Sequence, residues 1–108
     1  MGPWLFLVAA GLFEIGFTTC MKLSEGFTDI TYTIGFILCA ALSFYMLSKS
    51  LSVIPLGTAY AVWTGIGAFG TAVIGMMYFK DPISTARIIL LMVLIGSILG
   101  LKIIALME

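Results

Sequence analysis

A single acidic residue, Glu14, lies inside the apolar stretch of residues 4–21. An ionised carboxylate near the centre of a bilayer costs about 2.5 to 3.5 kcal/mol or more, so such residues face a protein interior or a wet path. Removal from water disfavours the charged form of a carboxyl group, whereas a nearby cation favours it. A proton and a cation would therefore compete for Glu14, and this negative coupling predicts that one is exchanged for the other.

Helical spacing places small, aromatic and hydroxyl side chains on the same face as Glu14. Gly11 lies one turn before the carboxyl group and leaves space beside it, and Phe17 and Thr18 lie one turn after it. Such a face is typical of a cavity wall. The alternative is a structural carboxylate paired with Lys22 or with a donor on another helix. Because Lys22 is two turns away, near the interface that lysine side chains reach, we favour a binding role for Glu14.

Three further residues are candidates for the walls of a site around Glu14. Tyr60 and Trp63 are three positions apart and therefore share one helix face. A carboxylate combined with aromatic rings can hold an organic cation. The hydroxyl group of Ser43 or Tyr60 could hydrogen-bond the carboxyl group. For each of the three, ordinary packing is the alternative.

The composition tells what kind of element carries these residues. The chain is 62% hydrophobic and 9% charged, with a mean hydropathy of +1.24, which is typical of an integral membrane protein. Four apolar stretches have the length of about 20 residues that a helix needs to cross a bilayer. They comprise residues 4–21, 30–47, 56–79 and 86–107. Long stretches without alternation exclude a β-barrel, so we predict an all-α membrane protein, one domain (1–108) with four transmembrane helices.

The polar residues exclude several classes of function. Five Lys and Arg residues balance five Asp and Glu residues, so no basic surface for nucleic acid is expected. Histidine is absent, and Cys20 and Cys39 lie in apolar stretches without a C-x-x-C spacing, so we expect neither a metal site nor a cofactor. We do not expect an enzyme, because the chain has no second carboxyl group within a span and no nucleophile beside a base.

The basic residues barely favour one orientation in the membrane. The side of the first and third loops has three of them and the side of both termini has two, and positive charge normally selects the inner side. These residues are Lys22, Lys80 and Arg87 on one side and Lys49 and Lys102 on the other. We therefore predict insertion in both orientations and an antiparallel dual-topology dimer, which would supply an inverted repeat. The alternative is that short loops simply carry few charges.

Two groups of glycines suggest close helix contacts. Gly96 and Gly100, in "GSILG", form a small-xxx-small pair, which makes the last helix the candidate for dimer contact. Gly65 and Gly67, in "TGIGAFG", indicate either a hinge or tight packing of the third helix.

The chain resembles the small multidrug resistance family over nearly its whole length. The resemblance rests on the lone Glu14 in four short spans, on "MKLSEGFT" after it, on "PLGTAYAVWTGIGAFG" and on "GLK" at 100–102. It implies a proton-coupled exporter of small organic cations in the bacterial inner (plasma) membrane, working as an antiparallel homodimer or, in some members, as a heterodimer of paired chains. It further implies that Glu14 of both subunits binds proton and substrate in turn, that Tyr60 and Trp63 line the pocket, that Ser43 hydrogen-bonds the glutamate, and that the glycines of the third helix form the bend.

The substrate branch is indicated by fewer residues. The third helix, Ser43 and Lys102 are similar to the guanidinium exporters, whereas "TTCMKLSEGFT" is closer to the quaternary-ammonium exporters. Phe17 stands where the guanidinium branch typically has tryptophan, so a π face is kept and an N–H donor is lost. We favour guanidinium ion and its small substituted derivatives as substrates. The alternatives are a quaternary ammonium or multidrug cation exporter and a non-transporting small membrane interaction subunit.

Overall fold

The computed structural model describes residues 2–107, in which four α-helices and no strands occur. The helices are α1 (Gly2–Leu23), α2 (Ile30–Ser50), α3 (Leu56–Tyr78) and α4 (Thr85–Met107). All four are long and apolar enough to cross a membrane. The prediction of an all-α membrane protein with four transmembrane helices is confirmed. α1 and α2 run past the apolar stretches into Lys22 and Lys49, because helical hydrogen bonding continues into the polar interface where hydropathy has already fallen.

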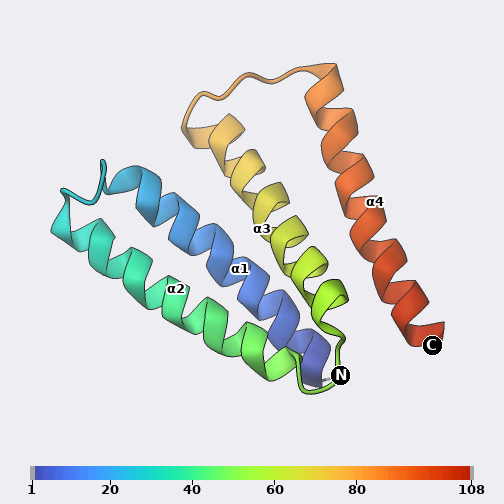
Figure 1. Ribbon diagram of the computed structural model, residues 1–108. Coiled ribbons are helices and arrows are strands. Elements are labelled where there is room, and N and C mark those ends of the chain that lie inside the picture. Colours follow the sequence, from blue (N-terminus) through green and yellow to red (C-terminus); the bar gives the residue numbers. More distant parts are fainter. Residues whose placement is uncertain (1, 108) are drawn as a thin grey trace.

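The order of the helices in space is α2, α1, α3, α4 (Figure 1). α1 contacts both α2 and α3, whereas α4 contacts only α3 among the described helices. Both chain ends lie at one end of the bundle, and the α1–α2 and α3–α4 loops lie at the other. α1 and α3 therefore run in the same direction. The chain measures 45 × 35 × 18 Å, so it is flat and encloses little interior.

A close contact between α1 and α2 is built from two glycines and two cysteines. The Cys39 sulfur lies against Gly16, 3.1 Å from where a Cβ atom would be, and the Cys20 sulfur lies 3.0 Å from the same position at Gly35. Each missing side chain thus accommodates the thiol of the opposite helix. Both cysteines are free and act here as small packing residues.

A short polar turn, residues 24–29, connects α1 to α2. Ser24 is fully buried, donates to the carbonyl oxygen of Met21 (2.7 Å) and accepts from the backbone N–H of Phe27 (3.0 Å). Asp29 caps α2 by accepting from the N–H groups of Thr31 and Tyr32. The turn therefore brings α2 back along α1 within six residues, 24–29.

Burial is concentrated in α1 and α3. The hydrophobic core consists of Leu7, Ala10, Ile54, Ala59, Val62 and Trp63. α4 contributes no buried residue. The core thus fixes the α1–α3 pair around Glu14 and leaves α4 at the edge of the chain.

Candidate functional site

Glu14 lies between α1 and α3, in the space left by Gly67. The carboxyl group lies so close to Gly67 that a Cβ atom at this position would overlap it. The Oε1 atom of Glu14 is buried and has no hydrogen-bond partner among the described residues. An unpaired buried oxygen is costly, because folding removes its water without replacing it. The side chain is thus in place to bind a ligand that supplies a donor.

Ser43 connects three helices one turn from Glu14. The indole N–H of Trp63 donates to the Ser43 hydroxyl (2.9 Å), and that hydroxyl donates to the carbonyl oxygen of Ala10 (2.7 Å). Ser43 and Trp63 are both buried. The resemblance implies a Ser43–Glu14 hydrogen bond, whereas in this structure Ser43 holds Trp63 and the backbone of α1. Helical geometry makes the Ala10 carbonyl the acceptor of the Glu14 N–H as well, so Ser43 bonds to the backbone one turn before the glutamate.

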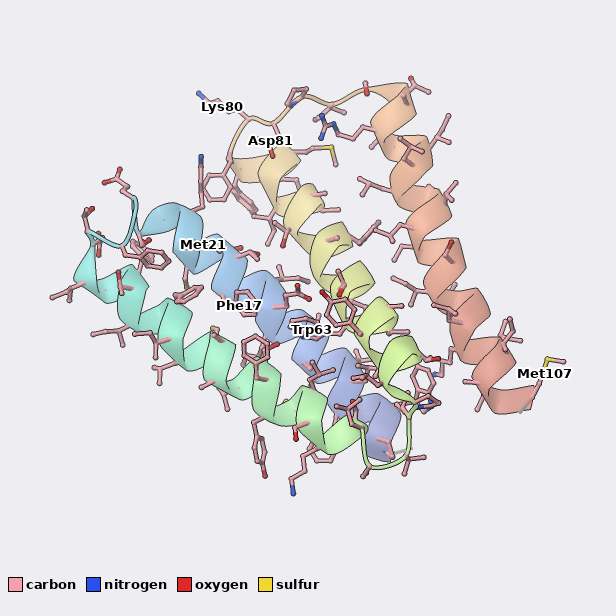
Figure 2. All side chains as sticks on the ribbon, in the orientation of Figure 1. Phe17, Met21, Trp63, Lys80, Asp81 and Met107 are labelled. Carbon is pink, nitrogen blue, oxygen red and sulfur yellow. The ribbon has the colours of Figure 1, made fainter. Side chains whose placement is uncertain are left out.

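Aromatic rings from three helices, α1, α2 and α3, form a continuous group. Phe17 of α1 stacks on Phe44 of α2 (centroids 6.2 Å apart) and meets Phe36 edge-on (5.7 Å). Phe44 continues to Trp63 (5.5 Å), and Trp63 continues to Tyr60 (5.7 Å). Figure 2 shows Phe17 and Trp63 pointing into the region between the helices. Trp63 is 7% exposed and Tyr60 57%, so the Tyr60 ring remains available to a ligand or a second chain.

Three of these five rings were predicted from the sequence, whereas Phe36 and Phe44 were missed. A signal was present, because the two are eight residues apart and therefore share one face of α2. Phe44 also follows Ser43 directly. The structure brings together the predicted residues: Phe44 links Phe17 to Trp63, and Trp63 contacts both Tyr60 and Ser43.

Thr18 lies one helical turn beyond Glu14 and bonds α3. Its hydroxyl is 2.7 Å from the hydroxyl of Thr71 and 3.0 Å from the carbonyl oxygen of Ile15. Thr71 was not among the predicted residues, since a threonine in a glycine-rich helix shows no pattern of its own. The pair joins α1 to α3 one turn beyond Glu14 on α1 and one turn beyond Gly67 on α3, toward the end of α3 at Tyr78.

The other predicted glycines fall into two groups. Gly11 lies against Ile66, and Gly65 lies against Ile98 of α4, so a side chain at either position would overlap a neighbour. α3 is continuous from Leu56 to Tyr78, and Gly65 and Gly67 serve close packing in this structure. At Gly96 and Gly100 of α4, by contrast, an added Cβ atom would meet nothing within 4 Å. The hinge and the dimer contact remain predictions.

The site offers one carboxyl group, aromatic faces and hydroxyl groups. Among residues 2–107, no three His, Cys, Asp or Glu side chains gather as a metal site would require. A carboxylate beside aromatic faces suits an organic cation, which it can bind by charge and hydrogen bonds while the rings contribute cation–π attraction.

The chain is similar in sequence to proteins of a known family. Residues 2–94 match the family model described as Small Multidrug Resistance protein. The chain is 42% identical to a guanidinium exporter of Yersinia pseudotuberculosis over 99 residues, which cover 92% of this chain and 95% of that protein. It is 41% identical to guanidinium exporters of Citrobacter freundii and Proteus vulgaris, again over 92% of this chain and over 94% and 95% of those proteins.

The resemblance inferred from the motifs is thereby confirmed. Four membrane-spanning helices together with these bacterial relatives make the chain a multi-pass protein of the bacterial inner membrane. This chain belongs to the small multidrug resistance family.

Proposed function

We propose that the protein is a proton-coupled antiporter that exports guanidinium ion and small substituted guanidinium compounds. Efflux of a small cation is supported by the family and by the relatives named guanidinium exporters. The observation that carries the mechanism is the unpaired buried oxygen of Glu14. Either a proton can neutralise the carboxylate or a bound cation can donate an N–H group to it, and the two exclude each other.

The surroundings of Glu14 support a small planar cation. Guanidinium carries N–H donors in a plane, which a carboxylate accepts in pairs. The aromatic group that includes Phe17, Phe44 and Trp63 offers ring faces to such a cation. The hydroxyl proton of Ser43 is donated to the Ala10 carbonyl oxygen, and its oxygen accepts from the Trp63 indole and fixes the orientation of that ring. We propose that the Phe17 ring contributes by stacking, whereas Glu14 alone supplies the charge.

The working unit is proposed to be an antiparallel homodimer. One chain is only 18 Å thick and buries few side chains, so it encloses little space of its own. An inverted second copy would bring a second Glu14 to the site and would cover Tyr60, which is exposed in one chain. α4, which has no buried residue and carries Gly96 and Gly100, is the proposed contact. A heterodimer with a related chain would use the same surfaces.

A proteoliposome assay tests this function. The protein is reconstituted, a pH gradient is imposed, and uptake of guanidinium is measured for the wild type, for Glu14→Gln and for Glu25→Gln. Glu25 is the matched control, because it is a carboxylate in the exposed α1–α2 turn. We expect Glu14→Gln to abolish exchange and Glu25→Gln to retain it. Full exchange by Glu14→Gln would refute the mechanism.

The same assay separates the alternatives. Uptake of tetramethylammonium instead of guanidinium would assign the protein to quaternary ammonium export. No uptake of either cation, combined with stable binding of another membrane protein, would indicate a non-transporting subunit. Acidifying the side from which the cation binds should raise the KM for guanidinium without lowering the maximal rate at saturating cation, because proton and cation compete.

A further inference from the structure

Three successive helical turns of α1 face three successive turns of α3 with polar or missing side chains. Glu14 lies against Gly67, and Thr18 bonds Thr71. One turn further, Lys22 and Gly75 line the same cavity. Because the two helices run in the same direction, these levels form a column from Glu14 toward the α3–α4 loop. Its side chains are hydroxyl groups and charges rather than the apolar groups that usually fill a contact between membrane helices.

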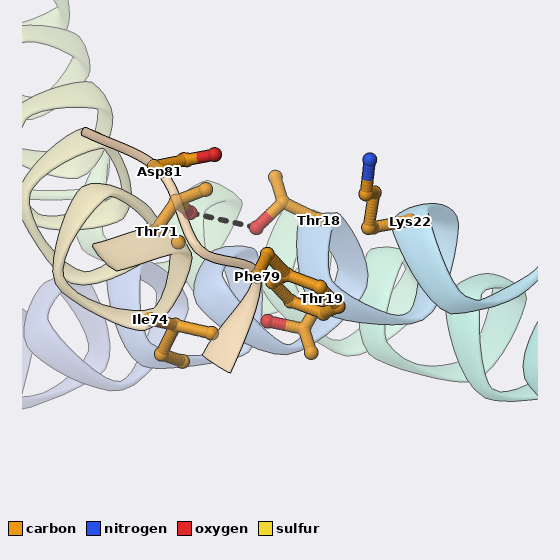
Figure 3. A pocket seen from close by; sticks show the side chains of 8 residues that line it. Thr18, Thr19, Lys22, Thr71, Ile74, Phe79 and Asp81 are labelled. Atoms are coloured by element: carbon orange, nitrogen blue, oxygen red, sulfur yellow. Dashed lines mark hydrogen bonds between the residues drawn. The ribbon is translucent and has the colours of Figure 1, made fainter. Parts of the chain in front are cut away.

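The column ends in a cavity of about 160 Å³. The polar side chains that line it are those of Thr18, Thr19, Lys22, Thr71 and Asp81. Figure 3 shows the Thr18–Thr71 hydrogen bond between the Asp81 side and the Lys22 side of this cavity. This bond lies on the α1–α3 contact between the cavity and Glu14.

Asp81 is turned back onto the end of α3 by the local backbone. Lys80 adopts a left-handed conformation (φ 60°), and the N–H of Asp81 then donates to the carbonyl oxygen of Gly75 (3.0 Å). Its carboxylate rests on Gly75, where a side chain would overlap it. This placement is specific, because it needs a glycine at 75 and an unusual backbone conformation at 80.

Two features at this end of α3 contribute negative potential to the cavity, which the positive charge of Lys22 partly offsets. The carbonyl end of a helix carries partial negative charge, which basic residues in the last turn usually offset. The last turn of α1 has Lys22, whereas the last turn of α3 has no basic residue. The Asp81 carboxylate adds a further negative charge at the same place. Two sources of negative potential therefore meet in a cavity whose threonine hydroxyls can accept hydrogen bonds.

We propose that this cavity is a second, outer binding site for the small organic cation that Glu14 binds. The Asp81 carboxylate supplies the counter-charge, the hydroxyls of Thr19 and Thr71 accept N–H groups, and the Thr18–Thr71 bond separates the outer site from Glu14. The inference rests on the proposed function, since it concerns the same substrate class. The outer site would bind the cation transiently between Glu14 and the membrane surface.

Lys22 makes the outer site weak. Its ammonium group lies 6.0 Å from the centroid of the Phe79 ring, and both residues line the cavity. A like charge lowers the affinity for an incoming cation and hastens its release. We therefore expect Lys22→Gln to tighten binding at the outer site.

Binding at the outer site is measured in a protein whose inner site is disabled. Purified ¹⁵N-labelled Glu14→Gln protein is titrated with guanidinium chloride, with sodium chloride as the ionic-strength control, and the amide signals of Gly75 and Asp81 are followed by NMR. We expect saturable shifts that disappear in Glu14→Gln/Asp81→Asn and persist in Glu14→Gln/Glu25→Gln. Lys22→Gln in the Glu14→Gln background should lower the dissociation constant about fivefold. Absence of saturable shifts, or their persistence without the Asp81 carboxylate, would overturn the proposal.

Transport gives a second readout. With Glu14 intact, Asp81→Asn should raise the KM for guanidinium about fivefold and leave the maximal rate nearly unchanged. Thr71→Val should also raise the KM for guanidinium, because it removes, at nearly constant volume, one of the hydroxyl groups proposed to accept N–H groups, whereas Thr71→Ser should leave the KM unchanged. An unchanged KM in Asp81→Asn would refute the outer site while the proposed function stands. A wild type that exchanges no cation would refute the proposed function, whereas the NMR titration would still decide whether Asp81 binds one.

Discussion

The carboxyl group of Glu14 occupies the space that a side chain at position 67 would fill. Glu14 thus fits between α1 and α3 because position 67 has no side chain, and its buried Oε1 atom makes no hydrogen bond to the described residues. This relationship explains why a glycine stands at a buried position in the middle of α3, and it can be tested by adding a single methyl group.

Gly67→Ala should displace the Glu14 side chain. The added Cβ overlaps both the carboxyl group and the Cγ atom, and overpacking of this kind costs about 1 to 3 kcal/mol. We expect a lower unfolding temperature in detergent and at least a tenfold loss of guanidinium exchange. Gly57→Ala is the control, because nothing lies within 4 Å of its added methyl group. Equal effects of the two substitutions would mean that helix flexibility, and not the contact with Glu14, makes Gly67 necessary.

The Ser43–Trp63 hydrogen bond should appear as a coupling energy. Ser43→Ala leaves the buried indole N–H of Trp63 without an acceptor, which costs about 1 to 3 kcal/mol. Trp63→Phe removes that donor, so Ser43→Ala should cost less in the Trp63→Phe background. A double-mutant cycle of unfolding free energies should give a coupling of about 1 kcal/mol. Additive effects would show that the bond contributes nothing to stability.

How far the site could be predicted from the sequence depends on the kind of information needed. Hydropathy and helical spacing were enough for four helices, because lipid leaves a spanning segment no other way to satisfy its backbone. The cost of a buried carboxylate singled out Glu14. The partners across helices could not be predicted, because the rotation of one helix against another is set by packing details such as Ile66 filling the space beside Gly11. For this reason the Ser43 acceptor and the Thr18–Thr71 pair were found only in the structure.

Gly65 should depend on Ile98 of α4. A Cβ atom at position 65 would lie 2.7 Å from Cδ1 and 2.9 Å from Cγ1 of Ile98, which is closer than packed carbon atoms allow. We expect Gly65→Ala to destabilise the protein by about 1 kcal/mol and Ile98→Ala to cancel most of that loss. Unfolding of the single and double variants in detergent measures the rescue. Leu99→Ala is the control, because Leu99 is exposed, and a rescue by it as large as that by Ile98→Ala would contradict the contact.

Gly100→Leu should separate folding of the chain from association. Nothing lies within 4 Å of an added Cβ at Gly96 or Gly100, so one chain accommodates a side chain there, whereas a second helix packed on the "GSILG" stretch would be pushed away. We expect helix content by circular dichroism to stay the same and the dimer dissociation constant, measured by Förster transfer between labelled chains in liposomes, to rise about tenfold or more. Guanidinium exchange should fall with the dimer fraction, because each site is proposed to need a Glu14 from both chains. Gly57→Leu is the control and should leave the dimer intact, because an added Cβ atom at Gly57 also meets nothing within 4 Å but the residue lies outside α4. A dimer that tolerates Gly100→Leu would move the contact away from this face of α4 and leave the exposed side of α2 as the surface to test next.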